Sequence, residues 1–296
     1  MSNKENSAYA VSSWYPGHMA KTRREIAENM KIIDVVIEIL DSRIPLSSRN
    51  PDIKEITKNK KKIILLNKID LADDVLTKKW QEYFSKEAIC MLTDSNSGKG
   101  VDKVSKKIDE IMEEEKIRQA RRGRINKTTR VMILGIPNVG KSSFINRISR
   151  KKSLEVANRP GVTKKNQWIR IGKNQELLDT PGVLWPKFDN KEISLNLSFT
   201  GTIKDDILEL TEIAYELLKK LMMDYEKNIL ERYKIDETEL NEIKSSSNFI
   251  YELMQVIARK RGALISGGKT DDEKVSRIIL DDFRSGRLGK ITLEKI

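Results

Sequence analysis

The stretch that decides the fold is Gly135-Ile136-Pro137-Asn138-Val139-Gly140-Lys141-Ser142, which matches the G-x-x-x-x-G-K-[ST] pattern of a phosphate-binding loop. It follows a predicted strand and precedes a predicted helix, so its backbone N–H groups can bind phosphate oxygens at the helix start. Lys141 is expected to reach the β and γ phosphates, and Ser142 to bind Mg²⁺. The residues expected to bind nucleotide here are Asn138, Val139, Gly140, Lys141, Ser142 and Ser143.

A second motif, Asp179-Thr180-Pro181-Gly182, comes downstream of the phosphate loop. Asp179 is expected to hold Mg²⁺ through water, and the Gly182 N–H to contact the γ-phosphate, which is how such loops sense that group. Thr163, between the two motifs, is the best candidate for a second Mg²⁺ hydroxyl. Lys141, Thr163 and Gly182 are therefore the predicted catalytic residues around the γ-phosphate.

A third motif, Asn67-Lys68-Ile69-Asp70, is expected to determine which nucleotide base the protein binds. The Asp70 carboxylate only accepts hydrogen bonds, which suits the two donors at guanine N1 and N2 and disfavours adenine. Asn67 and the Lys68 stem are expected to position the base. The base-side loop is expected over residues 93–98, with Ser95 as its contact residue. This loop departs from the usual Ser-Ala pair, which leaves its register open.

The order of these motifs is the reverse of the usual one, because the base motif precedes the phosphate loop. Strands alternating with helices up to about residue 180 indicate a doubly wound, mostly parallel sheet. We therefore predict an α/β protein with a circularly permuted P-loop GTPase domain and a small all-helical C-terminal domain. The expected division is a disordered leader over residues 1–13, the GTPase domain over 14–200 and the helical domain over 201–296.

Hydrophobic periodicity gives the expected elements of the first domain. Helices are predicted over residues 20–30, 75–86, 101–118 and 141–149. Strands are predicted over residues 32–40, 62–67, 88–93, 130–134, 167–171 and 176–178.

The net charge of +12 is distributed unevenly along the chain. Residues 1–200 carry 39 Lys and Arg against 25 Asp and Glu, whereas residues 201–296 carry 17 against 19. Basic clusters, such as Lys58 with Lys60, Lys61 and Lys62, favour a polyanion partner, because each phosphate contact releases counterions. Scattered lysines are more simply explained by solubility. Nucleic acid is the predicted partner class, ahead of a membrane surface.

Several features favour a cytoplasmic protein without a membrane anchor. The apolar runs are far shorter than a membrane span, and the start of the chain lacks an apolar signal region. The only cysteine, Cys90, lies in an apolar run and is expected to be a buried thiol in a reducing compartment.

The residue after Gly182 is Val183, where Ras-type GTPases place a glutamine that orients the attacking water. An aliphatic side chain cannot do this, so unassisted hydrolysis is expected to be slow. Another group must complete the site.

The full set of motifs resembles the ribosome biogenesis GTPase A (YlqF) family of circularly permuted GTPases. Besides the nucleotide motifs, three segments carry the resemblance: Trp14 to Lys21, Asp41-Ser42-Arg43-Ile44-Pro45 with Ser48 to Pro51, and Asp282 to Lys290. It runs from about residue 12 to the C-terminus. The resemblance implies binding to a precursor of the large (50S) ribosomal subunit and its rRNA, with GTP hydrolysis coupled to late maturation. It also implies GTP/GDP and Mg²⁺ as ligands and an RNA-binding helical domain.

Two further roles follow from the resemblance alone. His18, the only histidine, is the candidate for activating water once the protein is on the ribosome. It could instead stack on an RNA base or pack locally. Asn138 matches the phosphate-loop asparagine of potassium-stimulated GTPases, and thus implies a K⁺ site; it could instead only shape the loop.

Other functions stay open at this point. One is a non-catalytic, nucleotide-gated RNA-binding scaffold, and another is a GTPase that acts on tRNA or at a membrane surface. In the helical domain, the runs Arg259 to Gly262 and Arg284 to Lys290 are expected to contact RNA, unless they only complement helix dipoles. A monomer is expected.

Overall fold

The computed structural model describes residues 24–123, 127–150, 168–172, 174–180, 182 and 190–296. The predicted leader over residues 1–13 lies outside them. The chain divides into two compact units, each described by itself below. The first, called the sheet unit, comprises residues 14–186 together with 294–296. The second, called the helical unit, comprises the described part of residues 187–293.

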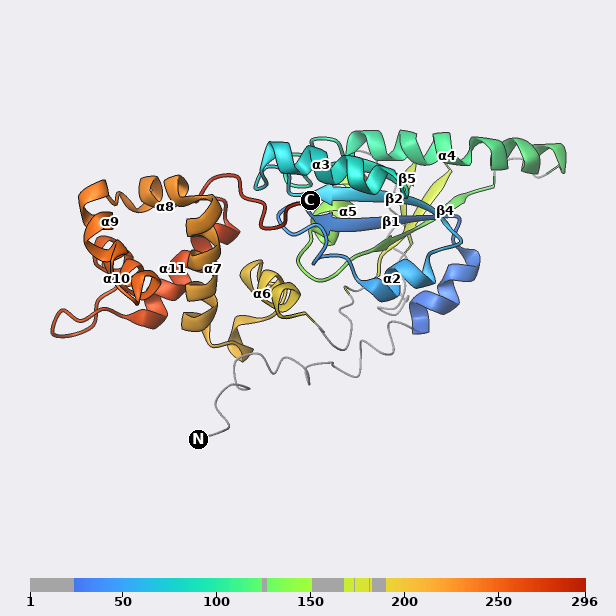
Figure 1. Cartoon of the computed structure of the whole chain (residues 1–296). Coiled ribbons are helices and arrows are strands. Elements are labelled where there is room, and N and C mark those ends of the chain that lie inside the picture. The colour runs from blue at the N-terminus through green and yellow to red at the C-terminus, as the bar shows by residue number, and fades with distance from the viewer. Residues whose placement is uncertain (1–23, 124–126, 151–167, 173, 181, 183–189) are drawn as a thin grey trace. The chain divides into compact units, whose positions relative to one another are not determined.

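The sheet unit is built on a six-stranded sheet with the order β3-β2-β1-β4-β6-β5 (Figure 1). Every neighbouring pair is parallel except β5 and β6. The prediction of a mostly parallel sheet is therefore confirmed. The strands are β1 (Val35–Asp41), β2 (Lys61–Asn67), β3 (Ile89–Leu92), β4 (Thr129–Leu134), β5 (Trp168–Gly172) and β6 (Gln175–Leu178).

Helices connect the parallel strands, as right-handed crossovers require. They are α2 (Pro51–Ile56), α3 (Asp74–Ser85), α4 (Asp102–Arg121) and α5 (Lys141–Arg150), preceded by helical residues 24–29 that continue into η2 (Met30–Ile32). The predicted strand over residues 32–40 begins later, at Val35, because Met30–Ile32 form a 3-10 turn. The short α2 was not predicted; the Asn50 side chain caps it by accepting a hydrogen bond from Asp52 N.

The sheet is covered on both faces. On one face Val36 pairs in register with Met132, and both pack with Ile53 of α2. On the same face Leu40 and Ile64 pack against Trp80 and Phe84 of α3, and Cys90 joins this cluster. Ile37 and Ile63, which point to the other face, are equally buried. A sheet buried on both faces explains the continuous apolar runs in β1 and β2.

The helical unit has only helices among its described elements, as predicted for the C-terminal part of the chain. They are α6 (Lys191–Phe199), η3 (Asp205–Ile207), α7 (Leu210–Asp224), α8 (Glu226–Tyr233), α9 (Glu237–Lys244), α10 (Phe249–Arg261) and α11 (Asp272–Arg284). Their buried faces supply one core, which includes Leu217 and Leu221 of α7, Leu253 and Ile257 of α10, and Ile279 of α11. Apolar side chains at helical spacing therefore form the inside of this unit.

The boundary between the units differs from the expected one. The division falls between Pro186 and Lys187, so α6, which we expected in the first domain, belongs to the helical unit. The reason lies in its contacts: α6 packs on α7 and α11, and the Arg284 guanidinium of α11 donates to the backbone carbonyls of Ser198 and Phe199. Arg284 also pairs with Asp205.

The last three residues of the chain belong to the sheet unit. The Glu294 carboxylate accepts hydrogen bonds from Leu46 N (2.6 Å), from Ser47 N (2.9 Å) and from the Ser47 hydroxyl. The backbone carbonyl of Glu294 accepts from the Trp80 indole N–H at 3.1 Å. The carboxylate thus holds the loop after β1, and the carbonyl holds α3.

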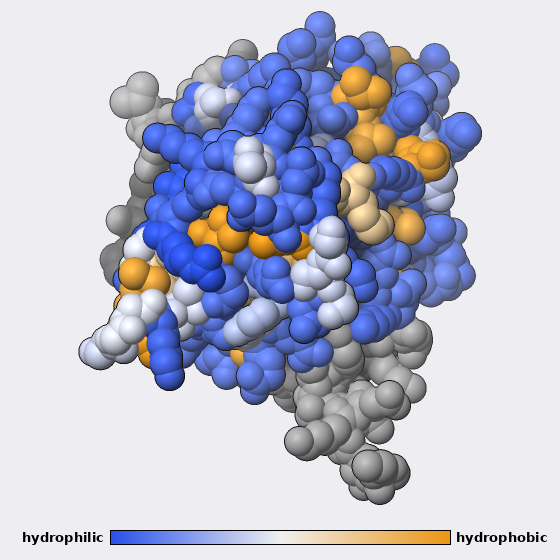
Figure 2. Space-filling view, turned by 60° about the vertical axis from the view of Figure 1, so that its left-hand side comes forward, coloured by the Kyte–Doolittle hydropathy of each residue, from blue (hydrophilic) through white to orange (hydrophobic). Residues whose placement is uncertain are grey.

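Among the described helices, none combines the length and the apolar character that a membrane crossing needs. The face drawn in Figure 2 is largely hydrophilic, with hydrophobic side chains in small separate groups.

Candidate nucleotide-binding site

A single buried amide joins the base motif to the phosphate loop. Asn67, at the end of β2, donates from Nδ2 to the backbone carbonyl of Val139 at 2.8 Å. Its Oδ1 accepts from the backbone N–H of Ser95 at 3.0 Å and from the Ser95 hydroxyl at 2.8 Å. The sheet order explains the meeting, because β1 alone separates β2 from β4. These bonds place Ser95 against Asn67, and its expected contact with the base stays a prediction.

Gly140 shows how closely the two segments approach. Its φ of +99° is in the region that favours glycine, and an added Cβ would lie 2.3 Å from Asn67 Nδ2. No side chain fits there without displacing Asn67. The glycine of the phosphate-loop pattern is therefore needed for contact with the base motif as well as for the turn.

Lys68 is held in a left-handed conformation, with a φ of 62°, by contacts on two sides. Its ammonium donates to the backbone carbonyl of Asn138, and lies 2.9 Å from the Asp41 carboxylate. Asp41 also accepts two hydrogen bonds from the Arg43 guanidinium, at 3.0 and 2.8 Å. Burial alone would raise the pKa of Asp41, but Arg43 and Lys68 outweigh it and hold the pKa well below its usual range.

Sequence reasoning did not find this role of Asp41 and Arg43. In the sequence analysis the two residues appear only as part of the family resemblance. Asp41 is the last residue of the buried strand β1, and Arg43 follows it closely. Carboxyl ends of neighbouring parallel strands meet at one edge of a sheet, and Asp41 pairs in register with Asn67. That placement is the signal that could have predicted a contact with Lys68.

Asp70 follows these residues and stays accessible to solvent. Partial burial raises the pKa of its carboxyl, and the nearby Asp94 carboxylate raises it further. Hydrogen-bond donors brought to Asp70 would favour its charged form. The position can thus take a ligand that offers N–H groups.

Lys141 is buried at the start of α5, with 9% of its surface exposed. Its ammonium donates to the loop carbonyls of Gly135, at 3.0 Å, and Ile136, at 2.7 Å. Burial lowers the pKa of Lys141 to about 8, although Asp179 opposes the shift. A buried cation with so little compensating charge is suited to a polyanionic ligand.

The segment after β6 approaches the same lysine. An added Cβ at Gly182 would lie 2.8 Å from Lys141 Nζ and 2.8 Å from the backbone nitrogen of Pro137. Burial raises the pKa of Asp179, and Lys141 opposes this shift. Ser142, in the first turn of α5, is exposed. The described residues contain no group of three or more His, Cys, Asp or Glu side chains placed to hold a metal by themselves.

Several predicted site residues lie outside the described residues: His18 and the segment Trp14 to Lys21, Thr163, and Val183. Their expected roles stay predictions.

The basic runs of the helical unit bind mainly within that unit. Lys260 donates to the backbone carbonyl of Lys234 and lies 2.7 Å from Glu239. Arg261 donates to the backbone carbonyl of Arg232, at 2.7 Å, and lies over the Tyr233 ring. With Arg284 engaged as described above, these side chains brace helices. These contacts were not expected from the sequence, and the expected contact of the runs with RNA stays a prediction.

Known proteins resemble this chain over nearly its full length. Residues 130–249 match the family described as "50S ribosome-binding GTPase". The chain is 43% identical over 285 residues to "Ribosome biogenesis GTPase A" of Bacillus cereus, covering 96% of this chain and 94% of the relative. It is 44% identical over 283 residues to the protein of the same name from Bacillus pumilus, covering 95% of this chain and 98% of the relative.

Two solved structures have a similar fold. A GDP-bound structure of a protein named YlqF superposes with a TM-score of 0.64 at 25% identity, covering 92% of this chain and 99% of that one. GNP-bound YlqF from T. maritima superposes with a TM-score of 0.61 at 25% identity, covering 93% and 98%.

Proposed function

Because this chain belongs to the ribosome biogenesis GTPase A family, we propose that its GTP hydrolysis serves the late maturation of the large (50S) ribosomal subunit. The precursor particle and its rRNA are the proposed partners, and binding to them stimulates turnover. The proposed setting is the cytoplasm, with the protein acting as a monomer. The observation that carries the proposal is the bond from Asn67 to Val139, which joins the two halves of one nucleotide site.

Guanine is the proposed base. The Asp70 carboxylate accepts from guanine N1 and N2, and Asn67 and Ser95 form the wall beside it. Lys68, fixed by Asp41, lies along the base with its hydrocarbon stem. Adenine would leave Asp70 without donors, so GTP and GDP are the proposed ligands.

The phosphates would lie over the loop from Asn138 to Ser143. Lys141 exchanges its loop carbonyls for β and γ phosphate oxygens, and the Gly182 N–H contacts the γ-phosphate. One hydroxyl, Ser142, and one carboxylate, Asp179, fit Mg²⁺, which typically takes one or two protein ligands together with phosphates and waters. Thr163 supplies the second hydroxyl. The metal would neutralise charge on the phosphates as the bond breaks.

Unassisted hydrolysis would be slow, because Val183 cannot orient water. We assign two groups to complete the site on the ribosome. His18 would activate the attacking water, and Asn138 would hold a K⁺ ion that supplies positive charge to the site. The helical unit contributes RNA contacts.

The test is GTP turnover by the full chain, in potassium and in sodium buffer, with and without precursors of the large subunit. We expect precursors to raise the rate strongly in potassium, and His18→Ala to bind GTP normally but lose that stimulation. Turnover that stays at the basal rate when the precursor is bound would overturn the proposal and favour a non-catalytic scaffold. Stimulation by tRNA or by anionic vesicles instead would assign the protein to another partner.

A further inference from the structure

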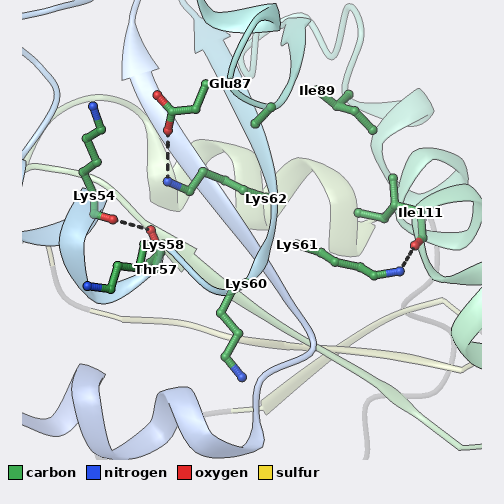
Figure 3. A pocket seen from close by; sticks show the side chains of 10 residues that line it. Lys54, Thr57, Lys58, Lys60, Lys61, Lys62, Glu87, Ile89 and Ile111 are labelled. Atoms are coloured by element: carbon green, nitrogen blue, oxygen red, sulfur yellow. Dashed lines mark hydrogen bonds and ion pairs between the residues drawn. The ribbon is translucent and has the colours of Figure 1, made fainter.

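A lysine-rich pocket of about 670 Å³ lies in the sheet unit, away from the nucleotide site. Its lining residues are Lys54, Thr57, Lys58, Lys60, Lys61, Lys62, Glu87, Ala88, Ile89 and Ile111. They come from α2 and the turn after it, from the starts of β2 and β3, and from α4 (Figure 3). We propose that this pocket, called the lysine pocket, binds the sugar-phosphate backbone of RNA.

The first argument is charge. Glu87 is the one carboxylate among these ten lining residues, against five lysines. That carboxylate is already shared, because it lies 2.5 Å from the Arg49 guanidinium and 3.4 Å from the Lys62 ammonium. Its hydrogen bond with Arg49 lowers the pKa of Glu87 to about 2, so it stays ionised but engaged. The pocket therefore keeps a positive surplus that a polyanion can neutralise.

The second argument is what holds the lysines in place. Lys60 donates to the backbone carbonyl of Ile33 at 2.8 Å, and Lys61 donates to that of Ile111. A carbonyl positions an ammonium without cancelling its charge, and leaves two of its three N–H donors for other acceptors. In the described part of the chain, no ion pair is found for the ammonium groups of Lys54, Lys60 and Lys61. These three lysines are thus the free charges of the pocket.

The third argument is spacing. Figure 3 shows Lys60 and Lys61 extending in different directions from the start of β2, with Lys61 reaching Ile111. Lys60 comes just before β2 and bonds to Ile33, whereas Lys61 begins β2 and bonds to Ile111, so these ammonium groups diverge. Divergent charges around a pocket suit successive phosphates along a chain better than one small anion. They also suit RNA better than a membrane, because no exposed large apolar side chain lines the pocket.

The lysine pocket can be tested separately from nucleotide binding. Lys61 begins β2 and Asn67 ends it, and six steps of about 3.3 Å place the two about 20 Å apart. RNA at one end of the strand and nucleotide at the other would not compete for residues. This inference rests on the proposed function in one respect: it takes the bound RNA to be the rRNA of the precursor particle.

The test compares variants of the full chain that change charge equally. Lys54→Gln/Lys60→Gln/Lys61→Gln removes the three free charges. The control, Lys78→Gln/Lys79→Gln/Lys103→Gln, removes three exposed lysines of the same unit that do not line the pocket. A third variant, Lys54→Arg/Lys60→Arg/Lys61→Arg, keeps the charge. The probe is a fluorescein-labelled RNA hairpin, with affinity measured by anisotropy over a series of salt concentrations.

We expect the glutamine variant to lower the slope of log K against log salt by about 2, since each phosphate contact contributes roughly 0.7 to 0.9. The slope of the arginine variant should stay near that of the wild type. The slope of the control variant should fall by less than half as much as that of the glutamine variant. GDP affinity must be unchanged in all three, which shows that they fold. Equal losses in the pocket variant and the control, or no loss in either, would overturn the inference.

Two further outcomes are informative. Unchanged RNA binding with reduced co-sedimentation on phosphatidylglycerol vesicles would assign the pocket to a lipid surface and overturn the inference. The slope change is independent of precursor-stimulated turnover. If the slope falls but precursors do not stimulate hydrolysis, RNA binding by the lysine pocket is supported and the proposed function is wrong. If precursors stimulate hydrolysis but the slope does not fall, only RNA binding by the lysine pocket is wrong.

Discussion

The side-chain amide of Asn67 donates a hydrogen bond to the backbone carbonyl of Val139 at 2.8 Å, across 72 positions of sequence. The same amide accepts from Ser95 on its other side. One side chain thus joins the base motif, the loop after β3 and the phosphate loop. The permuted order of the motifs changes the route of the chain but leaves their meeting point at the carboxyl ends of β2 and β4.

Replacing that amide should weaken nucleotide binding. In Asn67→Ala, Val139 and Ser95 lose buried hydrogen bonds, a loss of about 1–3 kcal/mol. We expect GDP affinity to fall roughly tenfold or more. Titration with a fluorescent GDP analogue measures the change, and Asn59→Ala, at an exposed asparagine, is the control. Equal affinities for the two variants would show that the amide does not organise the site.

Base preference should follow the carboxylate at Asp70. Asp70→Asn replaces one acceptor oxygen by an N–H₂ donor, which suits a purine with a carbonyl at C2. GDP should bind at least about tenfold more weakly and xanthosine diphosphate more tightly. Competition binding with both nucleotides tests this, with Asp109→Asn on α4 as the control. An unchanged ratio of the two affinities would remove Asp70 from the base site.

At high pH the protein should take up a proton at the Lys141 amine when it binds GDP. The pKa of Lys141 is lowered to about 8, chiefly by burial, so above that pH the free protein holds it increasingly neutral. Phosphates favour the charged form and raise the pKa again, so affinity should fall as the pH rises above 8. Calorimetry at about pH 9 in buffers of different ionisation enthalpy should show that the wild-type protein takes up a proton when it binds GDP. Lys141→Arg is expected to abolish the uptake.

The cluster of Asp41, Arg43 and Lys68 should matter for stability. In Asp41→Asn the buried Arg43 guanidinium and the Lys68 ammonium lose the charge of the Asp41 carboxylate, and breaking a buried ion pair typically costs about 3–5 kcal/mol. Urea unfolding followed by tryptophan fluorescence suits this test, because all four tryptophans belong to residues 14–186. Glu55→Gln, which breaks an exposed pair with Lys58, should change the unfolding free energy by less than about 1 kcal/mol. A similar loss in both variants would contradict the argument.

The contact at Glu294 can be tested in the same assay. Glu294→Ala removes the carboxylate that accepts from the backbone N–H groups of Leu46 and Ser47. Because water can replace it at the exposed Leu46, the loss should be about 0.5–1.5 kcal/mol. The control is Glu82→Ala, at an exposed glutamate of α3. If the two variants unfold at the same urea concentration, the tail does not stabilise the sheet unit.

Much of the fold followed from local patterns. The apolar runs that predicted β1, β2 and β4 are buried strands, because a sheet covered on both faces needs continuous apolar sequence. The start of β1 was predicted too early, since Met30 and Ile32 are apolar but form a turn. An apolar pattern does not by itself distinguish a turn from a strand, and Ile32 is apolar but 45% exposed.

The site was predictable where a motif fixes both residue type and spacing. The side chains of Asn67 and Lys68 bond to the backbone of Val139 and Asn138, so the base motif does contact the phosphate loop. The ion cluster of Asp41 with Lys68 was missed, because it depends on strand order, which no local pattern specifies. The ion pairs of Lys260 and Arg284 were missed for the same reason, since their partners Glu239 and Asp205 are distant in sequence.

The helical unit is attached to the sheet unit at both of its ends, because the chain enters it after Pro186 and returns to the sheet unit at Glu294. A truncated chain that ends at residue 186 therefore loses Glu294 together with the helices. In such a truncated chain the loop after β1 lacks the hydrogen bonds that Leu46 and Ser47 donate to Glu294.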